Sequence, residues 1–136
     1  MYSDNCIFCK IIKGEIPSNT IFENDEYKVI LDVGPVSKGH ALILPKDHYA
    51  DFYEIPEDVA VGAFKLAKKL MVQMTEKLNC DGFNIVQNNK EAADQSVPHY
   101  HMHLIPRYNG GQKLFGYSPL SISSEEQLEI KEQIVG

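Results

Sequence analysis

The 136-residue chain contains no tryptophan, and no apolar run approaches the roughly 20 residues that a membrane-spanning helix needs. We therefore expect no membrane segment. Residues 1–5 lack the basic and apolar regions of a signal peptide, which favours a cytoplasmic protein. Lysine and arginine number 13 against 19 aspartate and glutamate, and they are scattered through a chain of net charge -6. That balance argues against a nucleic-acid groove or an anionic membrane surface as the partner.

Cysteine is also scarce, and the three cysteines cannot all pair within the chain. A reducing compartment keeps thiols free for metal or for burial, so Cys6 and Cys9 favour a metal over a disulfide. Cys80 has no cysteine or histidine beside it, and we expect a buried apolar thiol without a function there. The chain shows no internal repeat, low-complexity tract or linker. Residues 1–136 are therefore expected to form one domain.

Hydrophobic periodicity predicts an α+β fold, in which helices cover an antiparallel sheet of about five strands. The expected helices are a short one over residues 6–13 that Gly14 ends, a long one over residues 59–78, and a C-terminal one that begins at the capping pair Ser123 and Glu126. The expected strands cover residues 20–23, 27–33, 40–44, 83–86 and 97–105. The polar segment 87–96 joins the last two strands.

The most informative motif is three histidines at alternate positions, His99, His101 and His103. Alternate residues of a strand point to the same face, so we expect the three imidazoles to lie together. A solvated strand face is the alternative interpretation. On a straight strand the outer two would be roughly 13 Å apart, too far for one metal ion to bind all three. The triplet is therefore expected to divide its roles.

A two-residue spacer separates Cys6 from Cys9, which suits a single tetrahedral zinc. His48 and the first histidine of the triplet, His99, would complete four ligands of a structural site. The alternative is a pair of small buried cysteines on a short helix. With zinc in this place, His101 and His103 remain free of metal.

A neutral imidazole is a competent nucleophile at pH 7 when a neighbour holds its tautomer and stabilises the cation that forms. Attack on phosphorus suits such a group. The hydroxyl of Ser96 and the amides of Asn88, Asn89 and Gln95 lie just upstream of the triplet and could donate hydrogen bonds to phosphate oxygens. An ordinary polar loop is the alternative.

On these residues the chain resembles the histidine triad (HIT) superfamily, and within it the Hint-like purine nucleoside phosphoramidase branch. The motifs that carry the resemblance cover nearly the whole chain: CIFCKIIKGEIP at residues 6–17, Asp32 followed by Pro35, Gly39-His40, Pro45-Lys46-Asp47-His48, and QSVPHYHMH at residues 95–103. The resemblance implies the HIT-like form of the α+β fold described above. It also implies a homodimer formed through the long helix and a sheet edge, although burial in the core explains the apolar stripe of that helix equally well.

The resemblance implies that His101 is the nucleophile, that His103 contacts the phosphate and that His40 supports the same cluster. Asp32 would bind the ribose hydroxyls, while Asn88 and Ser96 would hold phosphate and ribose oxygens. Relatives with the same two-cysteine start bind zinc through the residues that match Cys6, Cys9, His48 and His99. The purine pocket would be walled by Phe8, Ile11, Ile16, Ile30 and Leu42, each of which the apolar pattern alone would place in the core.

Three features depart from the family pattern or refine it. Lys90 and Asp94 stand where the family usually has glycine, which permits backbone conformations that a side chain penalises. Asn88 replaces the glutamine of members specialised for dinucleoside polyphosphates, and so favours the phosphoramidase branch. Without tryptophan, an aromatic contact near the C-terminus would fall to Phe115 or Tyr117.

We therefore expect a zinc-stabilised homodimeric hydrolase that cleaves purine nucleoside phosphoramidates or related nucleotidyl compounds through a nucleotidyl-histidine intermediate. The product would be the nucleoside monophosphate, and no catalytic metal is expected. The alternatives are a dinucleoside polyphosphate hydrolase, a non-catalytic AMP-binding regulator and a zinc-dependent interaction module.

Overall fold

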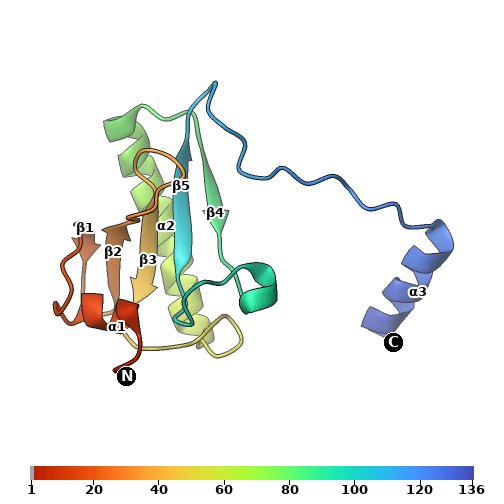
Figure 1. The fold of residues 1–136 in the computed structure, drawn as a ribbon, viewed down its shortest axis with the longest axis horizontal. Coiled ribbons are helices and arrows are strands. Elements are labelled where there is room, and N and C mark those ends of the chain that lie inside the picture. The colour runs from red at the N-terminus through yellow and green to blue at the C-terminus, as the bar shows by residue number, and fades with distance from the viewer. Residues whose placement is uncertain (1) are drawn as a thin grey trace.

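The computed structural model describes residues 2–136. Met1 lies outside the described residues, and with it the first residue of segment 1–5, for which the sequence analysis expects no signal peptide. The elements, drawn in Figure 1, are α1 (Ile7–Ile12), β1 (Thr20–Glu23), β2 (Tyr27–Leu31), β3 (Ala41–Pro45), α2 (Glu57–Leu78), β4 (Gly82–Val86), a short 3-10 helix (Glu91–Ala93), β5 (Met102–Arg107) and α3 (Ser124–Val135). The expected α+β class is confirmed.

The five strands form one antiparallel sheet in the order β1-β2-β3-β5-β4. β3 and β5 are neighbours at its centre although they are far apart in the sequence. Their register pairs Leu42 with His103, and His103 also faces Val86 of β4. The last histidine of the triplet therefore lies in the middle of the sheet.

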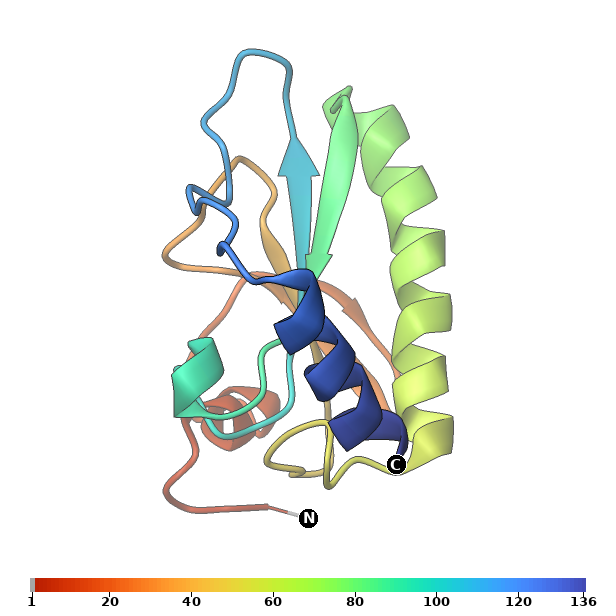
Figure 2. The ribbon, with the colours of Figure 1, turned by 90° about the vertical axis from the view of Figure 1, so that its right-hand side faces the viewer.

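Alternate residues of β3 contact different layers of the molecule. Ala41 and Ile43 belong to the core that packs under α2, whereas Leu42 and Leu44 belong to a second cluster with α1. Successive strand residues point to opposite faces, so the two helices cover opposite sides of the sheet. Figure 2 shows α1 and α2 on these two sides. β3 is buried along its whole length for this reason.

The expectation that one straight strand carries the whole triplet is wrong. β5 begins at Met102, and the chain bends over residues 97–99, next to Pro98, which has no N–H to give to a strand ladder. Instead, the N–H of Tyr100 donates to the carbonyl oxygen of Tyr49 at 2.6 Å. Of the three histidines only His103 lies in the strand, so His99 and His101 are free to point in other directions.

The other differences are smaller. α2 begins at Glu57, two residues before the expected start, with Pro56 as its N-cap. Strand β2 ends at Leu31, two residues earlier than expected. The polar segment before the triplet contains the short 3-10 helix, which the sequence pattern did not predict.

The last helix, α3, is attached differently from the other elements. The Ser123 hydroxyl accepts a hydrogen bond from the N–H of Glu126 at 3.1 Å, so the predicted cap is confirmed. None of the residues of α3 is buried, and an extended segment carries the helix away from the sheet in Figure 1. Across residues 2–136, no helix is both long enough and apolar enough to cross a bilayer.

Candidate functional site

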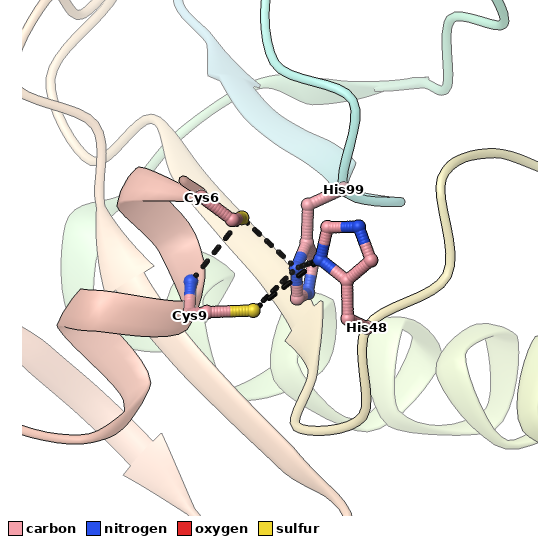
Figure 3. A group of neighbouring side chains, drawn as sticks. All are labelled: Cys6, Cys9, His48 and His99. Atoms are coloured by element: carbon pink, nitrogen blue, oxygen red, sulfur yellow. Dashed lines mark hydrogen bonds between the residues drawn. The ribbon is translucent and has the colours of Figure 1, made fainter. Parts of the chain in front are cut away.

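Four predicted ligands meet where α1 faces the end of β3 (Figure 3). Cys6 caps α1, and its Sγ accepts a hydrogen bond from the N–H of Cys9 at 3.3 Å, so one helical turn brings the two thiols together. The Sγ of Cys9 lies 3.3 Å from Nδ1 of His48, and the Sγ of Cys6 lies 3.4 Å from Nδ1 of His99. The two Nδ1 atoms are 3.1 Å apart. All four donor atoms lie within 4.8 Å of one another.

The orientation of His99 fits a metal ligand. Its Nε2 lies 2.9 Å from the carbonyl oxygen of Pro45, which only accepts hydrogen bonds, so the neutral ring carries its proton on Nε2. The lone pair on Nδ1 then points at the two thiols and at His48. Zinc bonded at about 2.3 Å to sulfur and about 2.0 Å to nitrogen would separate tetrahedral ligand atoms by about 3.3 to 3.8 Å. The observed separations of 3.1 to 3.6 Å are close to this range.

Burial sets the charge states in this cluster. It lowers the pKa of His99 to about 4, so the imidazole is neutral at pH 7, as a metal ligand must be. Burial raises the pKa of the Cys9 thiol, while a bound cation would stabilise the thiolate. The residues therefore form a possible metal site of two thiols and two imidazoles.

His101 points away from the four ligands. Its Nδ1 lies 2.7 Å from the carbonyl oxygen of His99, so Nδ1 carries the proton and Nε2 keeps the lone pair. The side chain is buried, and burial lowers its pKa. The ring of Phe8 lies edge-on at 5.0 Å between centroids. His101 is thus held as a neutral imidazole with a fixed tautomer, which is the nucleophilic form.

A chain of hydrogen bonds fixes the tautomer of His103 as well. The N–H of Val36 donates to Nδ1 of His40 at 3.0 Å, so the proton of a neutral His40 is on Nε2. That Nε2 lies 2.9 Å from Nδ1 of His103 and 3.5 Å from Oδ2 of Asp32. Nδ1 of His103 therefore accepts, and its Nε2 carries a proton.

The same geometry decides whether this second cluster is a metal site. Donor atoms of Asp32, His40 and His103 lie within 4.8 Å of one another. However, Nε2 of His40 keeps its proton while Nδ1 accepts from Val36, so it has no lone pair for a metal. Burial lowers the pKa of His40 and, to about 4, that of His103, so both rings are neutral at pH 7. The cluster is a hydrogen-bonded relay.

A cavity of about 370 Å³ opens above these imidazoles. Its lining includes the predicted residues Phe8, Ile11, Ile16, Ile30, Asp32, Leu42, Ser96, His101 and His103. Ile7, Pro17, Ser18, Leu31, Val33 and Val97 complete the wall. The sequence analysis did not select these six, because their only signal is adjacency to selected residues. The cavity is apolar on the side of α1 and polar at His101, His103 and Asp32.

Four residues predicted for catalysis or nucleotide binding lie outside this lining: His40, Asn88, Asn89 and Gln95. His40 acts on the site through His103, as described above. Gln95 is engaged with backbone: its Nε2 donates to the carbonyl oxygens of Ala50 and Val97 at 2.7 and 3.0 Å, and its Oε1 accepts from the N–H of Lys90 at 2.7 Å. Gln95 thus braces the loop before the triplet. A direct nucleotide contact of Asn88 or Gln95 stays a prediction.

The loop departures seen in the sequence have a structural counterpart. Lys90 has φ 73° and ψ 164°, a region nearly restricted to glycine, and Asp94 is left-handed with φ 66°. The Nζ of Lys90 lies 3.0 Å from Oδ2 of buried Asp51, and this bond lowers the pKa of Asp51. The N–H of Phe52 donates to Oδ1 of Asn89 at 2.7 Å. No local pattern singled out Asp51, since its partner is 39 residues away.

Known proteins are similar to this chain in sequence and in fold. The model of the HIT domain family matches residues 13–110. Adenosine 5'-monophosphoramidase of Schizosaccharomyces pombe is 38% identical over 131 residues, which are 96% of each chain. The crystal structure of a HIT family member from Bacillus subtilis has a TM-score of 0.85 and 37% identity, covering 96% of this chain and 95% of that one.

A further solved structure bears on the four-ligand cluster. The structure of a zinc-bound histidine triad family protein from Mycobacterium smegmatis has a TM-score of 0.78 and 35% identity, covering 85% of this chain and 84% of that one. The family model spans most of the chain, and the first relative matches nearly its whole length. On this evidence the chain belongs to the HIT domain family.

Proposed function

We propose that the protein is a nucleotide hydrolase that cleaves purine nucleoside phosphoramidates, or related nucleotidyl compounds, to the nucleoside monophosphate through a nucleotidyl-His101 intermediate. One observation carries the proposal: the proton of His101 is held on Nδ1 by the carbonyl of His99, and the ring lines the cavity. Relatives named adenosine 5'-monophosphoramidase support the substrate class.

The cavity suits the parts of a purine nucleotide. The apolar wall on the α1 side would contact the base, and Asp32 would accept hydrogen bonds from the ribose hydroxyls. The Nε2–H of His103 would donate to a phosphate oxygen, because its Nδ1 is engaged by His40. Ser96, which also lines the cavity, would donate to phosphate or ribose oxygens. These contacts would hold phosphorus next to His101.

The chemistry then needs two displacements at phosphorus. Nε2 of His101 forms a bond to phosphorus, the P–N bond to the amine breaks, and the amine leaves with the electron pair and takes a proton from solvent. The His101 ring becomes cationic, and the carbonyl of His99, which accepts its Nδ1–H, stabilises that charge. Water next attacks phosphorus and gives one proton to solvent, the P–Nε2 bond breaks with its electron pair returning to Nε2, and the nucleoside monophosphate is released. His101 returns to its neutral form.

The metal we propose for Cys6, Cys9, His48 and His99 is a structural zinc. Four protein ligands would close its coordination shell, so it would bind no substrate. Zinc there would connect α1 with the segments after β3 and before β5. It would stabilise the backbone at His99, whose carbonyl orients His101.

A homodimer formed through α2 and the free edge of β4 completes the proposal. Val61, Phe64 and Val72 of α2 are 51%, 50% and 62% exposed, and Ile85 on edge strand β4 is 42% exposed. Light scattering at micromolar concentration should give twice the chain mass. A monomer mass would reject the dimer.

We also propose that residues 1–136 form a single domain and that the protein is cytoplasmic.

The decisive experiment measures hydrolysis of an adenosine phosphoramidate by His101→Ala. Loss of the nucleophile should lower kcat by far more than about tenfold while AMP still binds. Turnover within about tenfold of the wild type would reject the nucleophile assignment. Replacing Lys131, which is exposed on α3 and does not line the cavity, by alanine is the control and should leave kcat unchanged.

The wild type distinguishes the alternatives. A higher kcat/KM for dinucleoside polyphosphates would favour that substrate class, and AMP binding without turnover of either substrate would favour a regulatory protein. In a metal-stripped sample that remains folded, kcat should persist. If it did not, the structural assignment of the metal would be wrong.

A further inference from the structure

A second hollow lies at the opposite end of the sheet from the four-ligand cluster. It has a volume of about 620 Å³ and forms between the loop before β3, the end of α2 and the segment after β5. These segments come together at the upper end of the sheet in Figure 1. The residues that line the hollow are Val36, Ser37, Lys38, Lys77, Leu78, Arg107, Tyr108, Gly111 and Gln112.

The charge of this hollow is opposite to that of the whole chain. Three of its lining residues are cationic and none is acidic, although the chain carries a net charge of -6. Within the part of the chain that the structure describes, neither Lys38 nor Lys77 forms an ion pair. Arg107 donates only to neutral oxygens, Oδ1 of Asn84 at 3.3 Å and the carbonyl of Gln112. The positive charges are thus available to a ligand.

An acidic residue next to the hollow is already engaged. The N–H of Asp81 donates to the carbonyl of Arg107 at 2.7 Å, and its Oδ2 accepts the N–H of Asn109 at 2.8 Å. The Asp81 carboxylate therefore has a backbone partner of its own. It reduces the local positive potential without lining the hollow.

The walls are held together by the protein itself. The Ser37 hydroxyl donates to the carbonyl of Pro106 at 2.5 Å, and the Tyr108 hydroxyl donates to the carbonyl of Lys38 at 2.8 Å. Nε2 of Gln112 donates to the carbonyl of Val36 at 3.5 Å. These bonds join two segments about 70 residues apart. The hollow therefore exists before any ligand binds, which lowers the entropic cost of binding.

We propose that this hollow is a binding site for a small, multiply charged phosphate anion, such as a polyphosphate chain. Two ammonium groups and one guanidinium around one space attract such an anion more strongly than a single charge, and charge-assisted hydrogen bonds would fix its oxygens. The site is separate from the nucleotide cavity, which is lined by Asp32 and the imidazoles. The two share one loop, in which Val36 lines the hollow and orients His40.

The test titrates the full chain with sodium tripolyphosphate at constant ionic strength, once without AMP and once with saturating AMP. Amide chemical shifts are followed by NMR. We expect saturable shifts in residues 36–38 and 107–112. The double variant Lys38→Ala/Lys77→Ala should weaken binding by about tenfold or more, because both ammonium groups are lost.

A matched control removes the same charge elsewhere. Lys13 and Lys131 are exposed, lie outside the hollow and outside α2, and Lys13→Ala/Lys131→Ala should change the affinity by less than about twofold, because screened surface charges contribute little. Circular dichroism verifies that both double variants are folded. Equal weakening in both variants, shifts that vanish when AMP saturates the nucleotide cavity, or no saturable shifts would each overturn the proposal.

Discussion

Nε2 of His40 lies 2.9 Å from Nδ1 of His103, and the N–H of Val36 occupies the other nitrogen of His40. One backbone hydrogen bond therefore determines which nitrogen carries the proton in both rings. Val36 sets the tautomer of His40, and His40 sets that of His103. A donor at Nε2 of His103 is the result, and it does not require either ring to be charged.

Replacing His40 by asparagine should change the pKa and the tautomer of His103 while the fold is retained. Repulsion between the two rings contributes to the low pKa of His103, so the substitution should move that pKa upward from about 4. We expect kcat/KM to fall by about tenfold or more, because the His103 tautomer is no longer fixed. NMR titration of the ring protons gives the pKa. An unchanged pKa together with unchanged kcat/KM would contradict the relay.

Stability should decrease as the pH falls below about 6.5. Burial lowers the pKa of His103 to about 4 in the folded chain, against about 6.5 for an ordinary histidine. Above pH 6.5 the His103 ring is neutral in the folded and in the unfolded chain, so protonation of the ring takes nothing from the free energy of unfolding. Between pH 6.5 and 4 the unfolded chain binds a proton that the folded chain does not. Urea unfolding at pH 7.5 and 5 measures the change, which should be smaller in His103→Asn. Equal decreases in both proteins would reject this explanation.

Removing the proposed zinc should lower stability. Cys9→Ser replaces one of four ligands, so we expect the purified variant to contain less than one zinc per chain. Its free energy of unfolding should be lower by several kcal/mol, because zinc binding at a structural site contributes directly to folding. Metal analysis and denaturant unfolding of the same sample check both points. The control is Cys80→Ala, at a buried cysteine outside the cluster, which should keep the metal. A wild type without metal would contradict the prediction.

The loop before the triplet offers a test of backbone strain. Lys90 adopts a conformation nearly restricted to glycine, which costs a side chain about 1–3 kcal/mol. Lys90→Gly and Lys90→Ala both remove the ion pair to Asp51 and the contact of Nζ with the Tyr53 ring, but only the glycine variant also removes the strain. The glycine variant should therefore be the more stable of the two by about 1 kcal/mol or more. Thermal unfolding of Lys90→Gly and Lys90→Ala measures the difference in their stability. Equal stabilities would mean that the loop relaxes away from this conformation.

Tyr100 lies fully buried in the core, and its hydroxyl has no hydrogen-bond partner among residues 2–136. Tyr100→Phe removes a desolvated polar group and should leave stability unchanged or raise it by up to about 1 kcal/mol. Tyr27→Phe is the matched control. The Tyr27 hydroxyl donates to the carbonyl of Val59 at 2.6 Å, so its loss should destabilise by about 1 kcal/mol. A larger loss for Tyr100→Phe than for Tyr27→Phe would show that the Tyr100 hydroxyl does have a partner.

Local patterns in the sequence were sufficient for the elements and for much of the site. Alternation and helical periodicity predicted the five strands and α2, because burial of one face leaves a repeat that can be read along the chain. Gly14 predicted the end of α1, and the capping pair Ser123 and Glu126 predicted the start of α3. Spacing and residue chemistry selected the four ligands, which the structure brings together. The resemblance to the HIT superfamily, whose members usually have glycine at positions 90 and 94, drew attention to Lys90 and Asp94, which both adopt a positive φ.

Tertiary structure alone decided where His99 and His103 carry their protons. The bend next to Pro98 separates His99 and His101 from β5. The protons of two rings are placed by partners far away in the sequence: the carbonyl of Pro45 for His99, and the Val36–His40 pair for His103. The bracing of the loop by Asp51 and the cationic hollow at Lys38 have the same origin. The sequence by itself determined which groups are present. The proton positions of His99 and His103 depend on hydrogen bonds to segments 54 and 63 residues away, which only the folded chain defines.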